Sequence, residues 1–411
     1  MLKRNLLFLS LFSAFSAFSQ LDPSVTSWII NTNSATGYNG LPSNVQQVQY
    51  SADNVYVSCS CIPGYDIGPW QGNPNTPSNQ NFVFKITRNP VQNTGTPINT
   101  ALGHIGVWTN GVSIFNPKDA NSYLSQDVWH QNAIVVEGSS FDDCLGHPAG
   151  NGEYHLHLNP TCLYDDADNT QHSPIIGFAF DGFPIYGAYG YTNADGTGAI
   201  KRMESSYRKR AITTRTTLSD GSTAANAGPV VSTTYPLGYY IEDFEYVQGL
   251  GDLDEHNGRF SVTPEYPNGS YAYFVTLDSN LDAEFPYILG LQYYGTVQAG
   301  NAGPGSGHNS VTETVSTYTA TTSMDEHYNT ISLNLFPNPT SNILNISANT
   351  VSDNRFNICI TDMFGKKLLQ QKDVSLNGAY FFDITKFSTG IYTLTVQSES
   401  YFSVSRFIKQ D

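Results

Sequence analysis

Short runs of β-branched and aromatic residues, separated by glycine, proline and asparagine, recur along almost all of this chain. Residues 55–57, 82–86 and 271–275 are typical examples. Side chains of these types favour strands, whereas the intervening residues favour turns. No segment of more than ten residues has a convincing helical period, and only 13% of the residues are charged. The pattern predicts a mostly β protein and excludes long charged helices and coiled coils.

The N-terminal residues have the pattern of an export signal. Lys3 and Arg4 precede an apolar run, residues 6–18, that is too short to span a bilayer comfortably. Small residues stand at positions 17 and 19, so we expect a signal peptide at 1–19 that is cleaved before Gln20. No other apolar run approaches the ~20 residues needed to cross a membrane. We therefore expect no integral membrane segment after signal cleavage.

The composition of the chain changes near residue 299. Residues 299–330 are rich in glycine, serine, threonine and valine and poor in aromatic residues. Such a segment cannot bury enough apolar surface to fold, and it behaves as a flexible tether. The sequence therefore predicts a large β-rich domain at 20–298, a flexible linker at 299–330 and a small domain at 331–411.

The net charge of −16 is concentrated in the large domain, because residues 331–411 contain seven basic and six acidic residues. This surplus of negative charge disfavours nucleic acid as a partner and permits the binding of cations. Basic residues cluster at 201–215. We expect them to neutralise neighbouring carboxylates rather than to recognise an anion.

The C-terminal segment alternates apolar and polar residues in six or seven short runs, which predicts a small immunoglobulin-like β-sandwich. It also contains three motifs: Leu-Phe-Pro-Asn-Pro-Thr at 335–340, Ile-Thr-Asp-Met-Phe-Gly-Lys at 360–366 and Phe-Ser-Thr-Gly-Ile-Tyr at 387–392. In this order they resemble the type A sorting domain of the type IX (Por) secretion system. The resemblance implies that the type IX secretion machinery is a partner of residues 331–411. It also implies secretion across the outer membrane, followed by attachment to the cell surface or release.

Four of the nine histidines lie between positions 147 and 172. On a strand, His155 and His157 would project from the same face with their rings close enough to chelate one ion. Neutral imidazole is a ligand for zinc, copper, nickel or iron, and we expect copper or zinc here. Because two ligands do not complete a site, we expect His147 or His172 to contribute as well.

Two acidic residues near the histidines are candidate supports for a metal. Asp143 or Asp181 could supply a carboxylate, and Asp181 could hold a histidine in one tautomer. Asp181 lies in a glycine-flanked turn, so a turn-capping role is an equally consistent interpretation. Two metal-free interpretations of the histidines stay open. The imidazoles could hydrogen-bond buried carbonyl groups, or they could carry out acid–base chemistry directly on a substrate.

Export makes disulfides possible, and the chain contains five cysteines. A bridge between Cys144 and Cys162 would close a loop around the histidines, worth on the order of 3 kcal/mol. Cys59 and Cys61 lie two apart in a run rich in valine and tyrosine, so we expect both on one face of a sheet. Either of them could instead pair with Cys144 or Cys162. Cys359 lies alone near the C-terminus.

The histidine-rich stretch carries a second resemblance. The sequence is Tyr-His-Leu-His at 154–157 and His-Ser-Pro-Ile-Ile-Gly-Phe-Ala-Phe-Asp-Gly-Phe-Pro-Ile-Tyr-Gly at 172–187, with further matches at 103–112 and 252–260. It resembles the YHYH family of exported proteins, over roughly residues 50–297. Leu156 stands where the family name has its second tyrosine, and on a strand this side chain would face away from both histidines. The resemblance implies no particular reaction.

An acidic loop offers a different kind of cation site. The spacing of acids around Asp252 and Asp254 is similar to that of a calcium loop, but the glycine and terminal glutamate of an EF-hand are missing. Two interpretations of this segment stay open: a calcium site near these residues, or an acidic loop that is simply solvated.

Two classes of function fit these observations. The first is an exported protein that binds a transition metal through its clustered histidines and acts as a metal-dependent enzyme, by a metal-activated water or by copper redox chemistry. The second is a binding or adhesion module for extracellular glycans or proteins, which is metal-free or merely stabilised by a metal. Three histidines beside an open cleft would favour the enzyme, whereas a closed site would favour the module. The catalytic residues and the substrate are not indicated.

Overall fold

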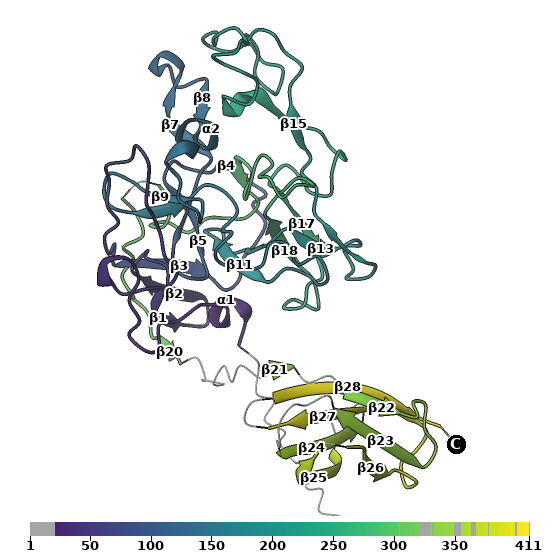
Figure 1. The fold of residues 1–411 in the computed structure, drawn as a ribbon. Coiled ribbons are helices and arrows are strands. Elements are labelled where there is room, and N and C mark those ends of the chain that lie inside the picture. The colour runs from purple at the N-terminus through teal and green to yellow at the C-terminus, as the bar shows by residue number, and fades with distance from the viewer. Residues whose placement is uncertain are drawn as a thin grey trace, which may run out of the picture. The chain divides into compact units, whose positions relative to one another are not determined.

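The computed structural model describes residues 21–303, 305–319, 329–330, 333–348, 355–362, 367–376, 378–398 and 401–410. The expected signal peptide at 1–19 lies outside the described residues. The chain divides into two compact units between residues 319 and 320. Both units are built mainly from strands, as Figure 1 shows, and this confirms the mostly β prediction. Within the described residues, no helix has the length and apolar character needed to span a membrane.

An eight-stranded sheet forms the centre of the large unit, in the order β17-β18-β12-β11-β5-β6-β10-β9. The pairs β12–β18 and β6–β10 are parallel, and the other pairs are antiparallel. The bounds are β5 (His104–Trp108), β6 (Ser113–Phe115), β9 (Gly146–Pro148), β10 (Tyr154–Leu156), β11 (Ile175–Ala179), β12 (Pro184–Tyr186), β17 (Gly258–Ser261) and β18 (Ser270–Phe274).

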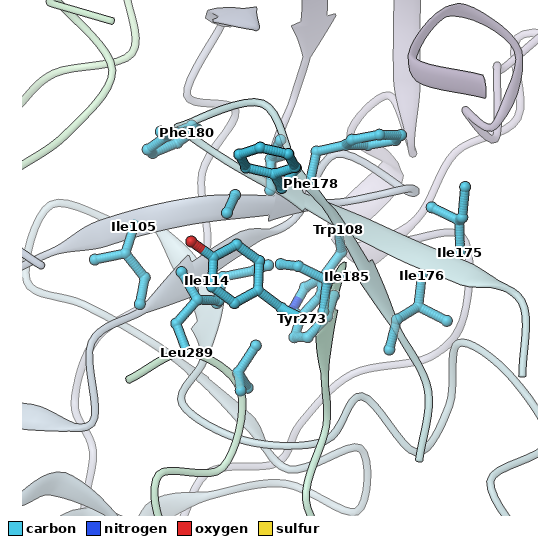
Figure 2. Close-up of a cluster of buried hydrophobic side chains, with 14 of the residues drawn as sticks. Ile105, Trp108, Ile114, Ile175, Ile176, Phe178, Phe180, Ile185, Tyr273 and Leu289 are labelled. Carbon is cyan, nitrogen blue, oxygen red and sulfur yellow. The ribbon is translucent and has the colours of Figure 1, made fainter. Parts of the chain in front are cut away.

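The middle strands of this sheet are covered on both faces. Every residue of β5 and of β11 is buried, which explains why both strands are almost continuously apolar. Close contact between them requires two glycines. A Cβ on Gly106 would lie 2.8 Å from the carbonyl oxygen of Phe178, and one on Gly177 would lie 2.9 Å from that of Val107. Figure 2 shows the apolar side chains packed around these strands, among them Ile105, Trp108, Ile114, Phe178, Ile185 and Tyr273.

Smaller elements surround the central sheet. A four-stranded sheet has the order β20-β1-β2-β3, and the remaining strands form pairs. The sheet consists of β1 (Val45–Tyr50), β2 (Asn54–Cys59), β3 (Phe82–Thr87) and β20 (Ser316–Tyr318). The pairs are β4 (Ile98–Asn99) with β19 (Gln292–Tyr293), β7 (Lys118–Ser122) with β8 (His130–Asn132), β13 (Tyr189–Tyr191) with β14 (Ile200–Arg202), and β15 (Tyr207–Lys209) with β16 (Phe244–Tyr246). The described helices are α1 (Pro23–Thr26), α2 (Ala133–Glu137) and the 3₁₀ turns η1 (Tyr38–Gly40), η2 (Tyr123–Ser125), η3 (Gly138–Ser140) and η4 (Ile241–Asp243).

The first part of the expected linker is attached to the large unit. Strand β20 pairs with β1, and the side chain of Glu313 accepts hydrogen bonds from Asn54 and Tyr56 at 2.7 Å each. Asn301 is fully buried and accepts a hydrogen bond from the backbone of Lys85 at 2.9 Å. The expectation of a flexible tether starting at residue 299 is therefore wrong for residues 299–303 and 305–319. A polar segment can add to a sheet edge through its backbone and side-chain amides without burying much apolar surface.

The small unit contains two sheets around one apolar core, which confirms the expected β-sandwich. One sheet has the order β21-β28-β27-β24-β25 and the other β22-β23-β26. Leu344 and Ile346 from one sheet and Ile358 and Leu394 from the other are all fully buried in the shared core. The strands are β21 (Asn329–Thr330), β22 (Leu333–Phe336), β23 (Ile343–Ala348), β24 (Arg355–Asp362), β25 (Lys367–Ser375), β26 (Tyr380–Asp383), β27 (Gly390–Gln397) and β28 (Tyr401–Lys409).

Candidate metal centre

Two adjacent strands bring three histidines together at one end of the central sheet. His147 lies in the middle of β9 and pairs in antiparallel register with His155 in the middle of β10. His157 follows β10 directly, so the period of two along an extended chain places it on the same side as His155. Tyr154 and Leu156 alternate with these histidines and are fully buried in the core. The predicted chelating pair and one of its two predicted partners therefore meet.

The three imidazoles point their Nε2 atoms at one another. Nε2 of His155 is 3.0 Å from Nε2 of His147 and 3.2 Å from Nε2 of His157, and all three atoms lie within 4.8 Å of one another. Each of the three residues is at most 5% exposed. Nitrogen ligands at 2.0–2.1 Å from a tetrahedral zinc ion would be about 3.3 Å apart. The three histidines could therefore hold a metal ion with little movement.

Hydrogen bonds at the opposite ring nitrogens fix two of the three tautomers. Nδ1 of His155 donates to the carbonyl oxygen of Glu153 at 3.1 Å, and Nδ1 of His157 donates to that of Asn116 at 2.7 Å. In the neutral rings, both Nε2 atoms must then carry lone pairs. Nδ1 of His147 lies 2.8 Å from the hydroxyl of Ser140, which can donate or accept. Two lone pairs thus face each other at 3.2 Å, an arrangement that needs a cation between them.

Aromatic rings hold the imidazoles in place. Phe115 stacks on His155 with ring centroids 3.7 Å apart and an interplanar angle of 20°. Phe141 packs edge-on against His147 at 4.8 Å. These contacts, together with the hydrogen bonds at Nδ1, fix both the position and the rotation of the rings, as metal sites generally require.

A carboxylate that the sequence did not reveal completes the cluster. Oε2 of Glu137, the last residue of α2, lies 3.2 Å from Nε2 of His157 and 3.6 Å from Nε2 of His147. Its side chain is 33% exposed, which makes it the most accessible polar group of the cluster. Burial opposes ionisation of Glu137, but its contacts with His157 and His147 outweigh this and lower its pKa below the ordinary value. The carboxylate is therefore ionised at neutral pH.

Burial keeps the histidines in the form that binds metals. It lowers the pKa of His147 to about 4, with a contribution from the neighbouring His157. It also lowers the pKa of His155 well below its ordinary value, with contributions from the other two imidazoles. Both rings are neutral at pH 7, and neutral imidazole is the metal-binding species.

The cluster opens onto a cavity of about 830 Å³ that is lined by all three histidines, Glu137 and Phe115. Lys118 and Asp119 contribute charged groups to the wall, and most of the other lining side chains are small or carry amides. A volume of this size suits a small organic molecule or one segment of a polymer.

Other predicted site residues lie elsewhere. His172 packs against Tyr186, Tyr191 and Phe274 at ring centroid distances of 4.9, 5.2 and 6.0 Å, and it is not part of the three-histidine cluster. The expectation that His172 shares the site is therefore wrong. Residues 157–171 separate it from β10, so proximity along the chain does not bring it near the other histidines.

Asp181 and Asp143 do not support the cluster. Asp181 is fully buried, accepts hydrogen bonds from Tyr273 at 2.5 Å and from the backbone of Gly295 at 2.8 Å, and caps its own turn through the backbone of Phe183. Asp143 is exposed. Its neighbour Asp142 is the buried one, and it accepts hydrogen bonds from the hydroxyl of Tyr154 and from backbone amides.

Cys144 and Cys162 form a disulfide that encloses all three histidines. Cys59 and Cys61 are free and buried, so the alternative pairings are wrong. The expected common face is also wrong, because β2 ends at Cys59 and Cys61 adopts a positive φ of 65°. Cys359 is also a free thiol.

The other two charged segments are largely paired within the chain. Asp252 forms an ion pair with Lys201 at 2.9 Å, and Asp254 accepts hydrogen bonds from the hydroxyl of Tyr271 and from backbone amides. This geometry gives no support to a calcium site near these residues. In the basic stretch, Arg208 pairs with Glu245 at 2.9 Å and Arg215 with Asp243 at 2.7 Å, as expected for charges that neutralise carboxylates.

Comparison with known proteins gives two family matches. Residues 83–285 match the YHYH protein family, and residues 334–410 match the secretion system C-terminal sorting domain. No curated protein matches the chain. Among solved structures, an immunoglobulin-like β-sandwich protein of the DUF3244 family from Bacteroides vulgatus is 19% identical, over 20% of this chain and 96% of its own, with a TM-score of 0.16. That similarity is too low to support an argument. The chain therefore carries a YHYH protein domain followed by a secretion system sorting domain, and it is a protein exported across the outer membrane to the cell surface or beyond.

Proposed function

We propose that the YHYH domain binds one zinc ion through Nε2 of His147, His155 and His157 and hydrolyses a substrate held in the adjoining cavity. The observation that carries the proposal is the pair of Nε2 lone pairs on His155 and His157, which hydrogen bonds to two backbone carbonyl groups turn toward each other at 3.2 Å. Three imidazoles without a sulfur ligand suit zinc or copper, and the Nε2 separations of 3.0 and 3.2 Å, close to those around a tetrahedral zinc ion, favour zinc.

The open side of the cluster supports catalysis over a purely structural role. A structural zinc site is normally closed by four protein ligands, whereas a catalytic site has three and keeps one position free. Here the three imidazoles border the cavity, so a position left free on a bound ion would be open to a substrate held there. A bound divalent ion would act there as a Lewis acid toward water or a substrate carbonyl or phosphoryl group.

Glu137 is the residue best placed to move a proton in this reaction. Its carboxylate contacts two of the three imidazoles and lines the cavity, so it can accept a proton from a water molecule beside the cluster. Its lowered pKa keeps it in the ionised form that accepts protons at neutral pH.

The metal part of the proposal is tested by a binding titration on the full chain. After metal removal with dipicolinate, we expect one equivalent of zinc to bind, and we expect the His155→Ala/His157→Ala variant to bind none tightly. His172→Ala is the matched control, because it removes another buried histidine outside the cluster, and it should bind one equivalent. Equal zinc binding by wild type and the double variant would refute the metal site. Binding of copper alone would refute the choice of zinc.

The catalytic part is tested with 4-nitrophenyl acetate and 4-nitrophenyl phosphate as general probes. We expect zinc-dependent hydrolysis of at least one of them. Glu137→Gln should keep the zinc but lose about 100-fold or more in rate, the usual scale of a general base. Asp119→Asn, a change at another carboxylate of the same cavity, should have little effect. Zinc-independent rates, or a Glu137→Gln variant as fast as wild type, would contradict this part.

A further inference from the structure

A second cavity lies on the other side of helix α2 from the metal centre. It has a volume of about 470 Å³ and shares no lining residue with the metal-centre cavity. Val135 lines this second cavity, whereas Val136 and Glu137, which follow directly on α2, line the first. Strands β15 and β16 contribute the facing wall through Tyr207 and Phe244. The helix thus forms a partition between two separate sites.

The floor of the second cavity is aromatic. Phe244 and Phe285 stack in parallel with ring centroids 4.0 Å apart, and Tyr207 meets Phe285 edge-on at 5.3 Å. Tyr287 packs against the same ring at 5.5 Å, and its hydroxyl accepts a hydrogen bond from Asn132, the residue that caps α2. The rings hold one another in place, and Tyr207, which is half-buried, is the most accessible of them, so it would contact a ligand at little entropic cost.

Three polar side chains around this floor have no hydrogen-bond or ion-pair partner among the described residues. They are the ammonium group of Lys209, the carboxylate of Glu284 and the hydroxyl of Tyr239. Lys209 differs in this from Lys201, Arg208 and Arg215 of the same basic stretch, which all form ion pairs. A donor, an acceptor and a group that does both are therefore available to a ligand.

The charge of the cavity restricts the ligand further. Arg208 and Lys209 are balanced by Asp278 and Glu284 among the lining residues. A strongly anionic or cationic ligand would meet a group of its own sign at short range, whereas an uncharged ligand with hydroxyl groups would use both signs. A sugar ring combines such hydroxyl groups with an apolar face that stacks on aromatic side chains.

We propose that this second cavity is a binding site for a neutral saccharide. It is independent of the metal centre, since the ligand would contact the far side of α2. A saccharide held there would lie in the same domain as the metal centre.

The proposal is tested by isothermal titration calorimetry of the full chain with maltohexaose, cellohexaose, laminarihexaose and mannohexaose. We expect at least one of these to bind with a Kd below about 1 mM, the weak end of specific recognition. Hexagalacturonate serves as the charged comparison. No binding of any neutral hexaose, or binding of hexagalacturonate alone, would overturn the proposal.

Variants then locate the site. Lys209→Ala/Glu284→Gln changes only groups without a protein partner, so the fold should persist, and we expect the Kd to rise at least tenfold. Lys201→Ala is the control, because it removes a paired lysine of the same stretch outside the cavity, and it should bind as wild type does. The His155→Ala/His157→Ala variant should also bind normally, which separates this proposal from the zinc proposal. A double variant at Lys209 and Glu284 with unchanged affinity would place the saccharide elsewhere and overturn the assignment.

Discussion

The three-histidine cluster and the pair of Arg215 and Asp243 are both buried polar groups in the same unit, but they differ in how completely they are satisfied. Arg215 and Asp243 are fully buried and form two hydrogen bonds of 2.7 Å with each other. Arg215 also donates to the carbonyl oxygens of residues 229, 235 and 236, and Asp243 accepts from two backbone amides. The Arg215 guanidinium lies over the ring of Tyr240 at 4.9 Å.

The histidine cluster lacks this completeness. Its outer nitrogens are all hydrogen-bonded, yet the Nε2 atoms of His155 and His157 face each other with lone pairs at 3.2 Å. A buried polar group without a partner costs on the order of 1–3 kcal/mol. Burial alone therefore does not distinguish a structural cluster of polar groups from a metal-binding site. A cluster that satisfies all its polar atoms needs no ligand, whereas one whose inner atoms repel one another requires an ion.

The largest expected effect comes from breaking the complete cluster. Arg215→Met would leave Asp243 charged and buried without its main partner, so the free energy of unfolding should fall by about 3–5 kcal/mol. Urea denaturation followed by tryptophan fluorescence measures this in the large unit, which holds all four tryptophans of the chain.

A double variant tests whether the loss comes from the uncompensated charge. Arg215→Met/Asp243→Leu removes both charges, and it should recover part of the stability that Arg215→Met loses. A loss below about 1 kcal/mol for Arg215→Met would show that this pair is not the closed structural cluster described above.

Removing the metal should have the next largest effect. At a zinc concentration 1,000 times the Kd, binding stabilises the folded state by about 4 kcal/mol. Chelation should therefore lower the unfolding free energy of wild type by that amount and leave the His155→Ala/His157→Ala variant unchanged. Thermal melts with and without dipicolinate measure the difference, and equal shifts in both proteins would contradict a metal at these histidines.

The disulfide should affect both the stability of the fold and metal binding, because it closes a loop that contains all three histidines. Replacing both cysteines in Cys144→Ser/Cys162→Ser should cost about 3 kcal/mol in the free energy of unfolding. We also expect weaker zinc binding, since His147 lies three residues from Cys144 and loses this restraint. The urea midpoint and the zinc Kd give the two values. Unchanged zinc affinity would show that the strands alone hold the ligands.

The smallest expected effect concerns pH and a third buried group, Asp181. Burial raises the pKa of Asp181 to about 6. A carboxyl group with a raised folded-state pKa stays protonated while the unfolded chain ionises, so its contribution to stability falls as pH rises from about 4 to 6 and is constant above. Wild type should lose roughly 1–3 kcal/mol relative to Asp181→Asn across this window. Parallel stability curves for the two proteins between pH 4 and 7 would contradict the raised pKa.

The sequence predicted the parts of this molecule that depend on local pattern. The strand-rich fold follows from the alternation of apolar and polar residues, and the pairing of His155 with His157 follows from the period of two along a strand. The disulfide was predicted as one of several pairings, because Cys144 and Cys162 bracket a short loop. The three motifs near the C-terminus were sufficient to predict the sorting domain.

The features of the site that the sequence did not predict depend on contacts between segments that are distant in the chain. Glu137 lies ten residues before His147 on a helix of five residues, and no spacing rule connects it to the histidines. His172 was a reasonable third ligand by proximity, but the loop that follows Cys162 carries it to Phe274. A difference of one position in a turn separates the buried Asp142 from the exposed Asp143, and sequence alone does not resolve such a difference.

X-ray absorption spectroscopy at the zinc edge, on the full chain loaded with one equivalent of zinc, tests the central claim most directly. The account predicts imidazole scattering from three nitrogens at 2.0–2.1 Å, with the remaining coordination from oxygen, and loss of this pattern in the His155→Ala/His157→Ala variant. Zinc coordinated by sulfur, or by fewer than two imidazoles, would contradict it.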